Sequence, residues 1–225
     1  MEDLTIAIIG GTGKEGMGLA LRWAAAGLNI VIGSRLEERA RQSADNINHR
    51  LGIKSVQGME NKEAVRNADI CVLTVVQSAH QQALESLRDD LQGKILIDAT
   101  ARIDYKDPKP PAPPSSAEQA QRILGPAVRI VAAFQNVPAK SLSNTVDQPL
   151  NADVMVCSDD IQAAEQVIQL ANVAGMRGYY AGTLENSNVI EGLTSILMGI
   201  NKHYGIKDAR IVVTGIPYLS SSDHK

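Results

Sequence analysis

The stretch that decides the fold is LTIAIIGGTGKEG, residues 4–16. Its first part, residues 4–9, is an apolar run of the kind that forms a buried β-strand. Gly11, Gly13 and Gly16 follow in the spacing GxGxxG. Glycine permits a tight turn and a close approach of the backbone to a pyrophosphate, and a helix that begins here points free amide groups at the phosphates. The stretch therefore predicts the first strand, turn and helix of a dinucleotide-binding unit.

Apolar runs and helical patterns continue to alternate beyond this unit. Strands are predicted at 28–32, 70–76, 95–98 and 128–132, and helices at 17–26, 36–51, 78–87 and 117–124. Alternating strands and helices form parallel βαβ units with right-handed connections. We therefore expect an α/β fold with a Rossmann-like doubly wound parallel sheet.

The chain beyond the sheet predicts a small C-terminal α/β unit. Strands are expected at 154–157 and 178–181, and helices at 160–173 and 188–204. The last helix has one apolar stripe, the pattern of a helix packed on a core, formed by Val189, Ile190, Leu193, Ile196, Leu197 and Ile200. Gly192, Ser195 and Gly199 share its opposite side, where they either let a ligand or a second subunit approach or face water.

A proline-rich segment, residues 106–114, interrupts the pattern with the sequence KDPKPPAPP. Proline has no amide proton and restricts the residue before it, so this segment must be extended. An exposed loop is favoured over a lid that closes on a substrate.

The end of the second predicted strand distinguishes NADP from NAD. An NAD enzyme places Asp or Glu there, whereas this chain has Ser34 and Arg35, with Arg39 one helical turn further on. A hydroxyl group and two guanidinium groups suit a 2′-phosphate through charge-assisted hydrogen bonds. The alternative is that Glu37 and Glu38 simply pair with the arginines. We expect NADP(H), bound by a Rossmann domain that spans residues 1–150.

The redox end of the cofactor is expected at the carboxyl ends of the following strands, where doubly wound sheets bind the reactive part of a ligand. The expected cofactor contacts are Gly11, Thr12, Gly13, Gly16, Ser34, Arg35, Arg39, Val75, Val76, Thr100 and Ala139. His80 lies nearby and is interpreted as a helix-surface residue. Because the chain has no nucleophile motif and no histidines at metal-ligand spacing, we expect no catalytic acid, base or nucleophile and no metal.

Composition excludes several classes of partner. The net charge is −3 and the pI about 5.8, which does not favour nucleic acid. No apolar run approaches the roughly 20 residues that span a bilayer, so no membrane partner is expected. Cys71 and Cys157 each lie in an apolar run without a CxxC pair, as expected for buried thiols in a reducing compartment. We expect a cytoplasmic protein.

Four motifs together resemble the NADPH-dependent coenzyme F420 reductases. They are the loop 9–13, the strand end 33–35, the turn 134–139 and the helix region 186–201. The resemblance covers nearly the whole chain. It implies hydride transfer between NADP(H) and coenzyme F420, an 8-hydroxy-5-deazaflavin, with the two rings stacked directly. It also implies a small C-terminal substrate and dimerisation domain, placed at residues 151–225, and a homodimer.

The resemblance also assigns binding residues. Thr12, Ser34, Arg35 and Arg39 carry over from the NADP site of the family. The deazaflavin site is expected to comprise Gln135, Asn136, Val137, Pro138, Asn188, Gly192 and Thr194. Three of these depart from the family, since Gln135 stands in place of a histidine, Asn188 in place of an arginine and Gly192 in place of a small polar residue.

These departures leave two alternatives open. The protein could be an NADPH-dependent reductase of another flavin or of a small electrophile. It could also be a non-catalytic NADP sensor, because Gly10, Gly13 and Gly16 fit the GxxGxxG spacing of extended short-chain-type folds, some of which only report redox state.

Overall fold

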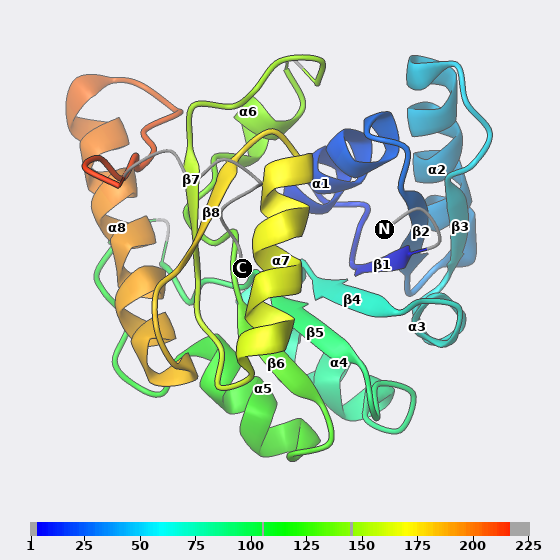
Figure 1. The fold of residues 1–225 in the computed structure, drawn as a ribbon, viewed down its shortest axis with the longest axis horizontal. Coiled ribbons are helices and arrows are strands. Elements are labelled where there is room, and N and C mark those ends of the chain that lie inside the picture. Colours follow the sequence, from blue (N-terminus) through cyan, green and yellow to red (C-terminus); the bar gives the residue numbers. More distant parts are fainter. Residues whose placement is uncertain (1–3, 105, 145, 217–225) are drawn as a thin grey trace.

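The computed structural model describes residues 4–104, 106–144 and 146–216 (Figure 1). Its main sheet has six parallel strands in the order β3-β2-β1-β4-β5-β6. They are β1 (Thr5–Ile9), β2 (Asn29–Ser34), β3 (Gln57–Glu60), β4 (Ile70–Leu73), β5 (Ile95–Asp98) and β6 (Arg129–Ala132). The order reverses beside β1, which is the topological switch point of a doubly wound sheet. The expected fold class is confirmed.

Both faces of this sheet are buried, because successive side chains of a strand point to opposite sides. Ile6 and Ile8 of β1 join one hydrophobic core, and Ala7 and Ile9 join the other. The first core is covered by α1 (Lys14–Ala25), α2 (Glu37–Leu51) and α7 (Ile161–Val173). The second is covered by α3 (Asn61–Arg66), α4 (Gln77–Leu87) and α5 (Ser116–Leu124). Because helices cover both faces of the sheet, its strands are apolar along their whole length and not only at every second residue.

A second, two-stranded parallel sheet is formed by β7 (Asp153–Val156) and β8 (Arg177–Tyr180). An antiparallel bridge between Ala132 and Cys157 links it to the edge of the main sheet. The two parts also share a core. Trp23 and Leu170 belong to the same hydrophobic cluster, and Trp23 Nε1 donates a hydrogen bond to the carbonyl of Leu170 at 2.8 Å. The boundary expected at residue 150 falls between the sheets and stays a prediction.

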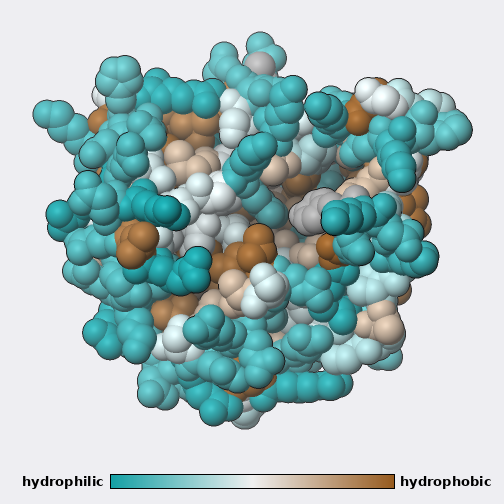
Figure 2. Space-filling model, turned by 180° about the vertical axis from the view of Figure 1, so that it is seen from behind, coloured by the Kyte–Doolittle hydropathy of each residue, from teal (hydrophilic) through white to brown (hydrophobic). Residues whose placement is uncertain are grey.

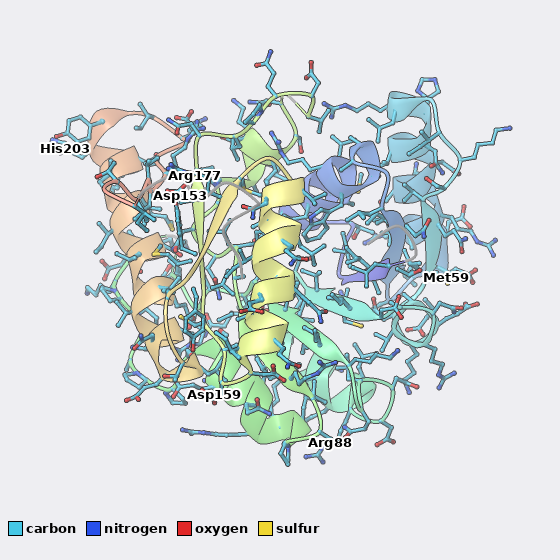
Figure 3. All side chains as sticks on the ribbon, viewed as in Figure 1. Met59, Arg88, Asp153, Asp159, Arg177 and His203 are labelled. Atoms are coloured by element: carbon cyan, nitrogen blue, oxygen red, sulfur yellow. The ribbon has the colours of Figure 1, made fainter. Side chains whose placement is uncertain are left out.

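The chain that follows α8 (Ser187–Tyr204) returns to the second sheet. The carboxylate of Asp153 binds Arg177 through two hydrogen bonds of 2.8 and 2.7 Å and accepts the backbone N–H of Val213 at 2.6 Å. Figure 3 shows Asp153 and Arg177 side by side, from β7 and β8. This buried carboxylate therefore fastens the chain near residue 213 to the small sheet.

The expected burial of the apolar stripe on α8 is wrong for half of its members. Val189, Ile196 and Ile200 are exposed, with 66%, 53% and 38% of their surface accessible, whereas Gly192 and Ser195 are buried. The reason is that the proline-rich segment packs on the side of the helix that carries the small residues Gly192 and Ser195. The Oγ of Ser195 donates to the carbonyl of Lys109 at 2.8 Å, and a Cβ on Gly192 would lie 3.4 Å from Pro110 Cβ.

Four short elements escape the sequence patterns: β3, α3, α6 (Ala139–Leu142) and the 3₁₀ helix η1 (Leu184–Asn186). In β3 the sequence QGME is too polar to read as a strand. Gly58 nonetheless has a packing role, because an added Cβ there would lie 2.3 Å from the backbone of Ala40 in α2.

Figure 2 shows the reverse face of the molecule, where hydrophilic side chains predominate and hydrophobic ones occur in small groups. No helix among the described residues is long and apolar enough to cross a membrane.

Candidate functional site

The glycine loop lies between β1 and α1, at the carboxyl edge of the sheet. Gly10 has a φ of 71°, which favours glycine. A Cβ on Gly11 would approach the carbonyl oxygen of Ile8 to 2.6 Å, and one on Gly16 would approach Gly11 Cα to 2.7 Å. Side chains at these positions would therefore open the turn. The loop leaves Thr12 and Gly13 exposed just before α1, where backbone N–H groups can bind phosphate.

The end of β2 presents the residues expected at a 2′-phosphate. Ser34 is buried and its Oγ accepts the backbone N–H of Leu36 at 3.3 Å. Arg35 and Arg39 are exposed and form no ion pair within the described part of the chain. Glu37 instead pairs with Arg41, at 2.5 Å. The alternative in which Glu37 occupies the two candidate arginines is thus not what the structure shows.

The ends of β4 and β5 are close to the glycine loop. A Cβ on Gly10 would lie 2.7 Å from Val75 Cγ1, so Val75 borders the loop, while Val76 is 69% exposed at the start of α4. Thr100 is buried, and its Oγ1 has no hydrogen-bond partner. A buried hydroxyl without a hydrogen bond destabilises the fold, unless a ligand provides the missing partner.

His80 is not the surface residue that we expected. It is buried, and its Nε2 lies 2.7 Å from Oδ2 of Asp98, which is fully buried at the end of β5. The other carboxylate oxygen of Asp98 accepts the backbone N–H of Thr100 at 2.9 Å. Asp98 therefore joins α4 to the strand end beside the expected nicotinamide position. Sequence reasoning missed it, although an aspartate that ends an apolar strand is a recognisable signal.

The turn after β6 and helix α8 form the other wall of the site. Gln135 is buried, with its Nε2 donating to the carbonyl of Asp98 at 3.0 Å and its Oε1 unpartnered. Asn136 Nδ2 donates to Thr194 Oγ1 at 2.8 Å, and that hydroxyl donates to the carbonyl of Gln135 at 3.0 Å. Phe134 has a φ of 74°, a left-handed backbone conformation that is rare for a residue other than glycine. The structure thus brings Gln135, Asn136 and Thr194 together beside Asp98.

The remaining expected residues lie around this wall. Val137 is buried, Pro138 is half-buried before α6, and Ala139 is the first residue of that helix. Asn188 is half-buried in the first turn of α8. Gly192 faces the proline-rich segment, so direct contact of Gly192 with a ring would require that segment to move.

An ion pair that sequence reasoning missed holds α8 in place. Glu191 is 1% exposed and accepts the Nε of Arg102 at 2.9 Å. It also accepts the backbone N–H of Ser116 at 3.0 Å, at the start of α5. Arg102 donates further to Oδ1 of Asn188, at 3.3 Å. A guanidinium group therefore reaches Asn188, the position at which the resembling family has an arginine.

The second missed residue is Glu15, a carboxyl group inside the glycine loop. Burial raises the pKa of Glu15 to about 8, and the negative charge of Asp98 raises it as well.

The thiols of Cys71 and Cys157 are buried, and burial raises the pKa of each to about 12. Thiols with such pKa values are poor nucleophiles.

A cavity of about 550 Å³ lies away from all these residues. It is found at the start of β6 and of α7, and its lining includes Arg122, Arg129 and Asp160. None of the expected cofactor or substrate residues lines it. Within the described residues no group of His, Cys, Asp or Glu is arranged to hold a metal ion.

Comparisons with known proteins find similar sequences and similar folds. The family model described as "NADP oxidoreductase coenzyme F420-dependent" matches residues 5–102. The F420-dependent NADP reductase of Methanothermobacter thermautotrophicus is 39% identical over 227 residues, which cover 95% of this chain and 96% of that protein. That of Methanocaldococcus jannaschii is 36% identical over 95% of this chain and 99% of that protein.

Solved structures share the fold at lower identity. One from Arthrobacter sp. FB24 has a TM-score of 0.78 at 21% identity and covers 94% of this chain and 100% of that chain. The pyrroline carboxylate reductase of Plasmodium falciparum has a TM-score of 0.61 at 16% identity and covers 91% of this chain and 66% of that chain. These two likenesses concern the fold alone. The two F420-dependent NADP reductases match 95% of this chain at 39% and 36% identity, and the chain therefore belongs to the family of coenzyme F420-dependent NADP oxidoreductases.

Proposed function

We propose that this protein transfers a hydride between NADP(H) and coenzyme F420. The observation that carries the proposal is the pair of unpartnered buried polar atoms, Thr100 Oγ1 and Gln135 Oε1, that flank Asp98. They lie on the sheet edge that also carries the glycine loop. A bound ring system with polar atoms at the strand ends would supply the hydrogen bonds that these two buried atoms lack.

NADP(H) fits the N-terminal side of this edge. The glycine loop, with Thr12 exposed, suits the pyrophosphate, and Ser34, Arg35 and Arg39 suit the 2′-phosphate. The nicotinamide would then lie over Val75, Val76 and Thr100. Ala139, at the start of α6, would border the ring.

Coenzyme F420 fits the opposite wall, where its deazaflavin would lie between the turn 135–138 and α8. Gln135, Asn136 and Thr194 supply polar atoms there, and Val137 with Pro138 supplies an apolar edge. At the end of this wall lie Asn188 and the guanidinium group of Arg102, which donates a hydrogen bond to it. Hydride transfer between two bound rings depends on proximity and alignment more than on an acid or base, with reacting atoms about 3–3.5 Å apart.

The test is a single-turnover measurement of NADPH oxidation by the purified protein. Coenzyme F420, its deazaflavin core without the tail, riboflavin and FMN are compared at equal concentration. Rapid oxidation with F420 and its core, but not with riboflavin or FMN, is expected. Oxidation by FMN alone would support a reductase of another flavin, and binding of NADPH without oxidation by any acceptor would support a sensor.

The exposed side of α8 is proposed to be the contact surface of a homodimer. Val189, Ile196, Ile200 and Tyr204 expose apolar surface along one side of the helix. Contiguous apolar surface on a helix is typical of a subunit interface. We further propose a cytoplasmic location, which the free, buried state of both cysteines supports.

Ile196→Glu is expected to convert the dimer to a monomer, because it places a charge in the middle of an apolar contact. Sedimentation velocity measures the change in mass. Lys202→Glu changes a charge on the same helix outside the apolar side and should leave the dimer intact. A wild-type protein that sediments as a monomer at micromolar concentration would contradict the proposed interface.

A further inference from the structure

Glu15 occupies an unusual place for a carboxyl group. It lies in the first turn of α1, within the GxGxxG motif whose backbone suits a pyrophosphate. A Cβ on the next residue, Gly16, would meet Thr74 Oγ1 at 2.7 Å, so this part of α1 sits over the end of β4. The redox ring of a dinucleotide lies on the β4 side of the switch point, and the adenine ribose on the β2 side. Because the negative charge of Asp98, at the end of β5, also acts on the carboxyl group of Glu15, we place Glu15 on the nicotinamide side.

The carboxyl group of Glu15 is not engaged by the protein. Glu15 is half-buried and forms no hydrogen bond or ion pair within residues 4–104, 106–144 and 146–216. The charge that acts on it is that of Asp98, whose two oxygens are bound to His80 and to the backbone of Thr100. Burial and that charge raise the pKa of Glu15 to about 8, so the group holds a proton at neutral pH in the free protein.

Elements packed against α1 bring no compensating cation to Glu15. β1 and β2 contain no titratable side chain. Lys140 of α6, Glu165 of α7, the charged residues of α2 and the neighbouring Lys14 are exposed. Arg22 of α1 itself donates to backbone carbonyls further along the helix. Within the described residues none of these side chains forms an ion pair with Glu15, so its carboxyl group is left to respond to a cationic ring of a bound ligand.

We propose that Glu15 is a redox-linked proton site: it keeps its proton beside neutral dihydronicotinamide and loses it beside cationic nicotinamide. The inference rests on the NADP(H) site proposed above. A neighbouring cation favours the ionised form of a carboxyl group. One proton passes from the carboxyl oxygen of Glu15 to solvent, and no bond of the cofactor forms or breaks in this step. When NADPH reduces a deazaflavin, which takes up a hydride and a proton, Glu15 releases one proton as the ring beside it becomes cationic.

The test compares the dissociation constants of NADP⁺ and NADPH between pH 6 and 8. The phosphates are common to both ligands, so their titration cancels in the ratio. Below the pKa of free Glu15, NADP⁺ binding must release its proton and NADPH binding must not. The ratio of the NADPH to the NADP⁺ dissociation constant should therefore rise by about threefold to tenfold per pH unit. Glu15→Gln, which cannot ionise, should make the ratio independent of pH.

Glu165→Gln, a change of an exposed carboxyl group on α7, is the matched control and should behave as the wild type. A second readout needs no variant: in weakly buffered solution at pH 7, binding of NADP⁺ should release close to one proton more per site than binding of NADPH. Equal proton release, or a pH-dependent ratio that survives in Glu15→Gln, would overturn the inference alone. Failure of both dinucleotides to bind would overturn the proposed function with it.

Discussion

Glu191→Ala is expected to lower the free energy of unfolding by about 3 kcal/mol. The carboxylate of Glu191 is 1% exposed and holds Arg102 and the start of α5 against α8. Removing it leaves the guanidinium group of Arg102 without its anion and the N–H of Ser116 without an acceptor. Urea unfolding measures the loss. The loss lies at the low end of the range for broken buried pairs because Arg102 keeps some contact with water, with 13% of its side chain exposed.

Two comparisons make this prediction specific. Glu191→Gln keeps a carbonyl oxygen for Ser116 but no charge for Arg102, so it should lose about half as much stability. Glu185→Ala changes an exposed carboxylate just before α8 and should lose less than about 0.5 kcal/mol. A wild-type-like stability of Glu191→Ala would mean that the ion pair contributes little to the attachment of α8.

The parts that the sequence predicts well are those set by neighbouring residues. The glycine loop and the order of strands and helices follow from local spacing. The site depends instead on contacts between distant segments. His80 meets Asp98 across 18 positions and Arg102 meets Glu191 across 89, and no periodicity encodes either meeting. The family likeness supplied the residues of the turn 135–138, but not the pair that reaches Asn188.

The last helix shows a second limit of sequence patterns. A hydrophobic stripe on a helix indicates that this side is covered, but not by what. In α8 the covered side of the single chain is the one with Glu191, Gly192 and Ser195, because the proline-rich segment and α5 pack there. On the apolar side, Val189, Ile196 and Ile200 remain exposed in the single chain. Polar residues at a buried helix face cannot be recognised until their partners are known.

Arg35→Ala is expected to weaken NADP⁺ binding about ten- to a hundredfold and to leave NAD⁺ binding nearly unchanged. A hydrogen bond to a charged group contributes roughly 1.5–3 kcal/mol, which corresponds to that range of affinity. NAD⁺ lacks the 2′-phosphate and so loses nothing. Arg41→Ala, in the helix α2 that follows Arg35 and paired with Glu37, is the matched control and should bind NADP⁺ as the wild type does. Calorimetric titration measures the affinities of the wild type and of both variants. Because Arg35 forms no ion pair in the described chain, its removal leaves no protein group unpaired, and a loss confined to NADP⁺ therefore reports on the phosphate. Equal losses for both dinucleotides would instead mean that Arg35 supports the loop and that the 2′-phosphate is bound elsewhere.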